Sequence, residues 1–317
     1  MGEVKITVLM PVYNGAEYIA EAIESVLLQT FGDFELLIIN DGSTDNTLNI
    51  INSFNDNRIV VISQENKGIG AALNKGLSLA RAEYVARFDA DDICYPDRLE
   101  KQYHFISSNP EYIVVGSSGE YMDAKGNHVF TYRPPGKTNQ EIKKVLHSVC
   151  PFIHSSVLFR KDVISSVGYN VNAYCFQDHL LWHKIKDHGK MYNLPDSLIR
   201  VRLNPTSISM DETKRPAAFH EIKQNALKQN DISKEEGARL LNIIRKQNNR
   251  KTKEGAYYSL LAKKFLWNNY QPVKARQHVR KAISINSFNM EGYVLFMLSF
   301  LPKTVVHNLY SLFRTAK

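Results

Sequence analysis

Strand-like and helix-like segments alternate through the first ninety residues, and this alternation limits the fold more than any other feature of the chain. Short apolar runs predict four strands, at 4–10, 34–39, 59–62 and 84–88. Segments with apolar residues at helical spacing lie between them, at 16–30, 43–54 and 70–80. Alternation at this pace is typical of parallel βαβ units, in which helices cover both faces of a sheet. We therefore predict an α/β, Rossmann-like fold with a mostly parallel sheet flanked by helices.

The pattern loosens after the fourth predicted strand. Helices are expected at 96–107 and 178–187, and strands at 113–117 and 157–159. From Arg215 onward strand signals are missing, and apolar residues recur at helical spacing. We predict one domain over 1–214, made of halves 1–92 and 93–214, followed by an α-helical region over 215–317.

Charge divides the chain at the same place. Residues 1–214 contain 21 Lys and Arg against 26 Asp and Glu, whereas residues 215–317 contain 19 against 6. The net charges of −5 and +13 that follow from these counts predict different partners for the two parts. The basic region should face an anionic partner, such as phospholipid, nucleic acid or an acidic protein surface.

Apolar runs and cysteines indicate the cellular setting. No apolar run approaches the roughly 18 residues that a membrane-spanning helix needs. A strand-like run follows Met1 so closely that we expect no signal peptide. Cys94, Cys150 and Cys175 are far apart and odd in number, which argues against a disulfide framework or a cysteine zinc site. These features favour a cytoplasmic protein.

Polar residues follow each of the first four predicted strands. Tyr13, Asp41 and Asn66 come after the first three, and three acidic residues come after the fourth. Because the carboxyl ends of parallel strands meet at one edge of a sheet, where ligands bind, we expect these side chains to share a site. Each also has an ordinary interpretation, with Tyr13 as a packing residue, Asp41 as part of a turn before a helix cap, and Asn66 as a loop residue.

The three acids after the fourth strand are harder to explain as an ordinary loop. Asp89, Asp91 and Asp92 lie within four residues and should repel one another. A hard divalent cation with oxygen ligands would remove that conflict, although an acidic surface loop remains the alternative. The chain has neither the Gly-x-Gly-x-x-Gly turn nor the Gly-x-x-x-x-Gly-Lys-Ser/Thr loop, so the usual NAD and ATP signatures are missing.

Four motifs in this order resemble the family 2 glycosyltransferases of the GT-A fold. The matching segments are 10–15, 39–47, 66–74 and 88–92, and the resemblance extends over about residues 4–212. It implies an inverting transferase that uses a nucleotide-diphosphate sugar, most often a UDP-sugar, together with Mn²⁺ or Mg²⁺. The half at 1–92 would then bind the nucleotide and the half at 93–214 the acceptor.

The resemblance assigns roles to residues at the first two strand ends. Pro11, Val12 and Tyr13 are similar to the wall of the uracil pocket. Asp41 is similar to the carboxylate that accepts the N3–H group of the base.

The third and fourth strand ends are assigned in the same way. Asn66 and Gly68 would lie near the base and ribose, and Asp89 resembles the ribose-binding or structural aspartate of the DxD motif. Asp91 resembles the metal ligand, and Asp92 is a candidate supporting residue beside it.

The second half of the predicted domain matches the family less densely. Asp178 is similar to the catalytic base, although Gln177 stands where the family usually has Glu. His154 is a candidate for phosphate or acceptor contact or a structural residue, with the two roles equally open. Arg202 resembles a diphosphate contact, but Asn204 occupies a position that is His in the family, which leaves the metal ligand set uncertain.

The resemblance predicts transfer of a sugar to a hydroxyl of a glycan or lipid-linked acceptor in bacterial surface polysaccharide synthesis. The alternatives are a sugar-phosphate nucleotidyltransferase, a retaining transferase, and a nucleotide-sugar-binding, membrane-associated module without transfer activity. We expect no nucleic acid partner, because the aromatic residues of 215–317 lie mainly in apolar runs rather than between basic residues. That region either lies on an anionic membrane, which would place the enzyme peripherally at the inner face of the cytoplasmic membrane, or packs on the catalytic domain.

Overall fold

The computed structural model describes residues 3–207, 210, 212 and 215–315, and it confirms the α/β fold. The predicted alternation appears as strands β1 (Ile6–Val12), β2 (Phe34–Asn40), β3 (Ile59–Ser63) and β4 (Tyr84–Arg87), with helices α1 (Ile19–Leu27), α2 (Thr47–Asn52) and α3 (Ile69–Leu79) between them. Strands β1 and β2 are buried along their whole length, as expected of central strands covered on both faces.

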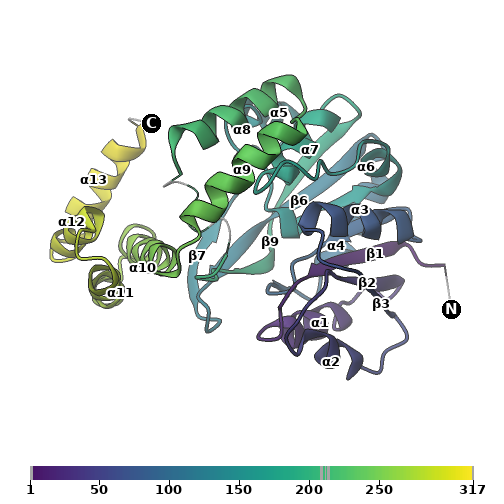
Figure 1. The fold of residues 1–317 in the computed structure, drawn as a ribbon, viewed down its shortest axis with the longest axis horizontal. Coiled ribbons are helices and arrows are strands. Elements are labelled where there is room, and N and C mark those ends of the chain that lie inside the picture. The colour runs from purple at the N-terminus through teal and green to yellow at the C-terminus, as the bar shows by residue number, and fades with distance from the viewer. Residues whose placement is uncertain (1–2, 208–209, 211, 213–214, 316–317) are drawn as a thin grey trace. The chain divides into compact units, whose positions relative to one another are not determined.

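The four N-terminal strands form the parallel part of a nine-stranded sheet, in the order β3-β2-β1-β4. Ile6 of β1 lies beside Phe34 of β2 and Tyr84 of β4, so the carboxyl ends of these strands meet at one edge. Figure 1 shows α3 on one side of these strands and α1 with α2 on the other. Helix α3 lies so close to the sheet that a Cβ atom at Gly76 would be 2.1 Å from Leu9 Cδ1.

The rest of the sheet adds antiparallel pairs that the sequence did not predict. The strands of this part are β5 (Ile93–Cys94), β6 (Tyr112–Met122), β7 (His128–Tyr132), β8 (Leu158–Arg160) and β9 (Lys190–Arg202), of which β6 and β8 lie where strands were predicted. Strand β8 runs antiparallel to both β4 and β6, and β9 runs antiparallel to β5. Strand β9 was missed because its first half contains Pro195 and Asp196, which are uncommon in strands.

The remaining helices before residue 250 are α4 (Arg98–Ser108), α5 (Asn139–Val145), the 3₁₀ helix η1 (His154–Ser156), α6 (Lys161–Val167), α7 (Gln177–Ile185), α8 (Ala217–Gln229) and α9 (Lys234–Gln247). One apolar core joins the sheet to α3, α5, α6 and α7. It contains Leu9 and Val85 from the strands, Leu73 from α3 and Trp182 from α7. Helix α7 is therefore held by the same core that holds the parallel strands.

The chain divides into two compact units. Unit 1 consists of residues 1–119, 131–201 and 221–239, and unit 2 of residues 120–130, 202–220 and 240–317. The boundary predicted near residue 214 stays a prediction, and residues 213–214 lie outside the described part of the chain. All the predicted site residues except Arg202 belong to unit 1.

Unit 2 is mainly helical, in agreement with the predicted helical region. Its last four helices are α10 (Arg250–Trp267), α11 (Pro272–Ile285), α12 (Met290–Leu298) and α13 (Lys303–Thr315). Leu261 of α10 and Val279 of α11 are fully buried where these two helices pack together. The Ala124 N–H group donates to the Tyr257 hydroxyl over 3.1 Å and ties the 120–130 segment to α10. Among the described residues, every helix is too short or too polar to cross a bilayer.

Candidate active site

The loops after β1 and β2 are hydrogen-bonded to each other at the carboxyl edge of the sheet. Asn14, whose φ is +51°, donates its backbone N–H to Ser43 Oγ over 2.9 Å. Its side-chain oxygen accepts the Thr44 N–H over 2.8 Å. Tyr13, immediately before this junction, has 52% of its surface exposed, whereas Pro11 and Val12 are buried. In the predicted pocket wall, Pro11 and Val12 are therefore buried and the ring of Tyr13 is exposed.

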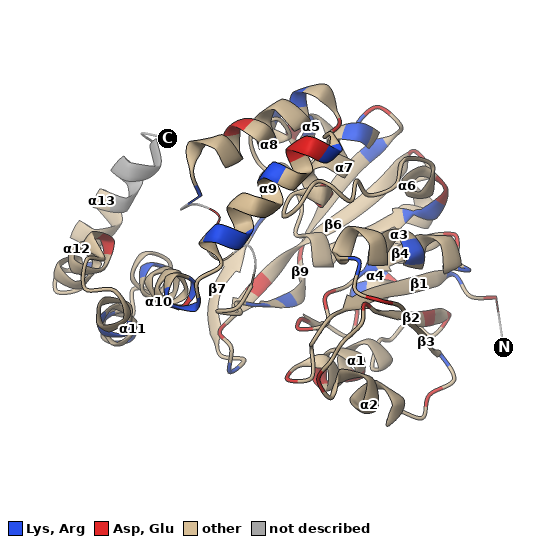
Figure 2. Ribbon diagram, in the orientation of Figure 1, with Lys and Arg blue, Asp and Glu red and all other residues tan. Residues whose placement is uncertain are grey.

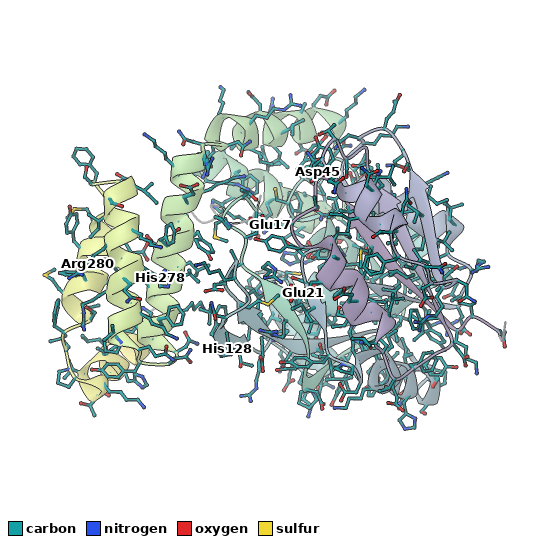
Figure 3. The ribbon with its side chains drawn as sticks, turned by 90° about the horizontal axis from the view of Figure 1, so that it is seen from below. Glu17, Glu21, Asp45, His128, His278 and Arg280 are labelled. Carbon is teal, nitrogen blue, oxygen red and sulfur yellow. The ribbon has the colours of Figure 1, made fainter. Side chains whose placement is uncertain are left out.

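Asp45 closes the same junction from the second loop, and Figure 3 labels it together with Glu17 and Glu21. Its carboxylate accepts the N–H groups of Ala16, at 3.1 Å, and Thr47, at 3.0 Å. Loss of solvent around the carboxylate acts to raise the pKa of Asp45, but hydrogen bonds from the Thr47 hydroxyl and from these N–H groups outweigh it and lower that pKa. Because the residues before Thr47 form hydrogen bonds with the loop after β1, helix α2 begins at Thr47 and not at the predicted residue 43.

Asp41 holds the loop after β3. Its Oδ1 atom accepts hydrogen bonds from Gln64 Nε2, at 2.7 Å, and from the Lys67 N–H, at 3.0 Å. Its Oδ2 atom accepts the Gly68 N–H over 2.8 Å. A carboxylate has about four acceptor positions, so one position remains beyond these three bonds. Asp41 thus fixes the loop that carries Asn66, whose side chain is exposed.

The three acids after β4 have different environments. Asp89 forms an ion pair with Arg87, whose side chain is 3% exposed while that of Asp89 is 35% exposed. Asp92 is 2% exposed and accepts the Ser155 hydroxyl over 2.5 Å. Asp91 is half-buried. Donors from the protein therefore relieve much of the repulsion that the sequence predicts.

Arg87 and Tyr169 are site residues that the sequence analysis missed. His154 Nε2 lies 3.0 Å from the Tyr169 hydroxyl, and burial together with the Arg87 charge holds the pKa of His154 well below its usual value. Burial raises the pKa of Tyr169, and the charges of Asp178 and Asp89 act in the same direction. The sequence could have indicated Arg87, because it is a charged residue in an otherwise apolar strand. His154 is therefore a neutral, hydrogen-bonded ring beside this cluster.

Asp178 lies in the first turn of α7, near the same cluster. The Cys150 thiol donates to Asp178 Oδ2 over 3.5 Å. Burial raises the pKa of Cys150 well above its usual value, and the negative charge of Asp178 adds to this effect. The thiol therefore stays protonated and can orient one carboxylate oxygen. The charges of both Asp178 and Asp89 act on the Tyr169 hydroxyl.

Gln177 precedes Asp178 and is half-buried. Its side-chain carbonyl oxygen is buried, and no hydrogen-bond partner for it is found within the described ranges. Gln177 therefore lies beside the predicted base without bracing it through that oxygen.

Arg202 and Asn204 belong to unit 2. Arg202 is 7% exposed, and its Nη1 atom donates to the Ala124 carbonyl over 3.2 Å. The Asn204 side chain accepts the Thr206 N–H over 2.9 Å, which makes a local turn. The predicted diphosphate contact of Arg202 stays a prediction, and the end of its motif, at 208–209, lies outside the described residues.

The acids at the edge were tested for their fit to a divalent cation. No cluster of three or more His, Cys, Asp and Glu side chains that could enclose a metal occurs in the described part of the chain. Asp89 pairs with Arg87, Asp92 accepts the Ser155 hydroxyl, and Asp91 is half-buried. Mg²⁺ is commonly held by one or two carboxylates, with water and substrate phosphates completing its shell. These residues fit a cation shared with a diphosphate, not one enclosed by protein alone.

Comparison with known proteins adds independent findings. Residues 7–168, just over half of the chain, match the model of the family described as Glycosyl transferase family 2. The amylovoran biosynthesis glycosyltransferase AmsE of Erwinia amylovora is 33% identical over 202 residues, which cover 62% of this chain and 75% of AmsE.

Two solved structures share the fold. Staphylococcus aureus TarS 1–349 in complex with UDP has a TM-score of 0.55 at 17% identity, covering 99% of this chain and 92% of TarS. The mannosyltransferase PcManGT from Pyrobaculum calidifontis, in complex with GDP-Man and Mn²⁺, has a TM-score of 0.55 at 17% identity and covers 98% and 88%. At these identities the likeness is one of fold.

Proposed function

Because this chain belongs to glycosyl transferase family 2 and is a glycosyltransferase, we propose that it moves a sugar from a UDP-sugar to a hydroxyl group with inversion. The acceptor is a glycan or a lipid-linked glycan of bacterial surface polysaccharide synthesis, reached at the inner face of the cytoplasmic membrane. AmsE, which acts in amylovoran biosynthesis, supports this class of acceptor. The observation that carries the proposal is the single edge of unit 1 that holds Tyr13, Asp41 and the acids after β4.

The nucleoside of the donor fits the first part of that edge. The exposed ring of Tyr13 offers a stacking surface for a base, and buried Pro11 and Val12 hold that ring in place. Asp41 has one acceptor position beyond its three loop hydrogen bonds, which suits the N3–H group of uracil. Asp89, fixed by Arg87 but one-third exposed, suits a ribose hydroxyl.

The diphosphate is assigned to the acidic end of the edge. Asp91 is the residue that would hold a divalent cation there, and such a cation would supply Lewis-acid stabilisation of the negative charge that the departing diphosphate gains. Asp92, fixed by Ser155, supports the turn that carries Asp91. Arg202 is proposed as a diphosphate contact from the motif resemblance.

Asp178 is proposed as the general base. It takes the proton of the acceptor hydroxyl, whose oxygen bonds to the anomeric carbon as the bond from that carbon to the diphosphate breaks on the opposite face. The Cys150 thiol donates to Oδ2, so that Oδ1 is the atom left to take the proton.

Replacing the base tests the mechanism. Asp178→Asn should lower turnover by at least the roughly 10²-fold typical of general-base loss, because the amide cannot take the proton. Binding of UDP, measured by calorimetry with Mn²⁺, should be unchanged. Turnover close to that of the unchanged chain would remove Asp178 from the role.

Replacing the metal ligand tests the donor site separately. Asp91→Asn should abolish the Mn²⁺-dependent part of UDP binding, measured by calorimetry with and without chelator. Asp33→Asn, an exposed acid in the loop before β2, is the matched control and should bind as the unchanged chain does. Equal metal dependence in Asp91→Asn and Asp33→Asn would contradict the assignment.

The products distinguish this proposal from its alternatives. A transferase releases UDP, whereas a sugar-phosphate nucleotidyltransferase releases pyrophosphate or consumes it. A binding module binds a UDP-sugar and releases neither. Thermal-shift screening against UDP-, GDP- and dTDP-sugars with Mn²⁺, followed by product analysis for the best donor, separates all three.

A further inference from the structure

Helix α12 in unit 2 presents large apolar side chains to solvent. Met290, Tyr293, Val294 and Met297 lie at the spacing i, i+3, i+4, i+7, so they form one stripe, and their exposed fractions are 72%, 41%, 48% and 64%. Two more exposed aromatic residues flank the helix in the sequence, Phe288 at 89% and Phe300 at 64% exposure. These six residues are called the α12 face.

A helix surface that faces water is normally polar, whereas the α12 face is apolar. The opposite side of α12 is already packed, because Gly292 and Leu295 are buried. A helix that is apolar on all sides is normally buried on all sides, and contiguous exposed apolar patches mark interaction sites. The α12 face therefore needs a partner.

Two arginines of α11 lie against aromatic rings at the carboxyl end of α12. The Arg276 guanidinium lies 4.7 Å from the Phe300 ring centroid, and that of Arg280 lies 5.8 Å from the centroid of Phe296. Arg276 also donates to the Ser299 carbonyl over 2.8 Å, which holds it at the carboxyl end of α12. Lys303 is exposed at the start of α13. Figure 2 shows Lys and Arg along α10 and α11, and Figure 3 labels Arg280.

The one acid of α12 does not offset these cations. Glu291 forms an ion pair with Lys263 of α10, at 2.8 Å. Residues 215–317 as a whole carry 19 Lys and Arg against 6 Asp and Glu. The partner of the α12 face must accept apolar side chains and also supply negative charge beside them.

We infer that the α12 face inserts into the interfacial layer of a bilayer with anionic headgroups. Met and Phe side chains enter the acyl boundary, while Arg276 and Arg280 stay level with the phosphate groups. A two-fold contact with the same face of a second copy fits less well, because it would bring like-charged arginines together across a poorly solvated interface. This inference concerns a surface of unit 2 and does not depend on the transfer reaction.

Flotation of the full chain with lipid vesicles tests the inference. Vesicles of phosphatidylcholine with about one-third phosphatidylglycerol should bind the chain, and vesicles of phosphatidylcholine alone should bind it less. The double variant Met290→Asp/Met297→Asp should lower partitioning on the order of tenfold or more, because charged groups must then leave water. Leu28→Asp, an equally exposed apolar residue of unit 1, is the matched control and should bind as the unchanged chain does.

Two further measurements make the test decisive. Arg280→Gln should lower binding to the anionic vesicles by about fivefold, the effect of one surface cation. Far-UV circular dichroism and the urea unfolding midpoint should be close to those of the unchanged chain in all three variants, which shows that they are folded and separates this test from that of the transferase. Equal flotation of the double variant and the Leu28→Asp control, or no flotation of either, overturns the inference. Lipid-free self-association that the double variant abolishes in sedimentation equilibrium would overturn it in favour of a second copy.

Discussion

The ion pair between Arg87 and Asp89 predicts that loss of the two partners will have unequal effects on stability. The Arg87 side chain is 3% exposed and that of Asp89 is 35% exposed. Asp89→Asn removes the countercharge and leaves a guanidinium in the core. Arg87→Met replaces the buried cation with an apolar side chain and leaves a carboxylate that water reaches.

The structure sets the size of each effect. Removing one partner of a buried ion pair costs about 3–5 kcal/mol when the remaining charge is uncompensated. Asp92, 2% exposed, also acts on the charge of Arg87, so Asp89→Asn should fall at the low end, at about 3 kcal/mol. Arg87→Met should cost only about 1 kcal/mol, because a solvated carboxylate loses little when its partner is removed.

Urea unfolding at neutral pH measures both changes, with a constant slope showing that the unfolded state is comparable. The double variant Arg87→Met/Asp89→Asn should be close in stability to Arg87→Met alone, because it contains no unpaired buried charge. If Arg87→Met destabilises the chain as much as Asp89→Asn does, the buried guanidinium is not the source of the cost and the reasoning fails.

Two other properties can be predicted from unit 1. Lowering the pH from about 7 to 5 should reduce the free energy of unfolding, because burial lowers the pKa of both His179 and His183 and the unfolded chain therefore binds protons first. Each histidine contributes up to about 1.4 kcal/mol per pH unit below its unfolded pKa of about 6.5, and urea midpoints that do not change over this range would contradict the prediction. Gly76→Ala should cost about 1–3 kcal/mol in the same assay, because its Cβ would be 2.1 Å from Leu9 Cδ1 in the core. Lys75→Ala, exposed on the same helix, should change stability by less than about 0.5 kcal/mol, and an equally small effect of Gly76→Ala would show that α3 can move away from the sheet.

The sequence predicts the α12 face only in part. Residues 290–298 are apolar enough to suggest an interfacial helix, and the surplus of Lys and Arg in 215–317 indicates an anionic partner. Which side of α12 is buried depends on its contacts with α10 and α11. Apolar periodicity cannot predict this side, because apolar residues occur all around the helix.

The sequence by itself determined the parallel part of the sheet, the helical region after residue 215 and the positions of the candidate site residues along the chain. Apolar periodicity is a local property, and the edge where parallel strands end follows from it, so Tyr13, Asp41 and Asp91 could be placed at one edge before any coordinates.

The tertiary structure alone decided how those residues are held. Ser155 lies 63 positions from Asp92, Cys150 lies 28 from Asp178, and the strands that carry the antiparallel part of the sheet return from distant segments. Such pairings depend on where two remote segments pack, and the free energy of that packing is shared over the whole core. A local sequence pattern therefore does not predict that a hydroxyl, a thiol or a buried guanidinium will contact a given acidic side chain.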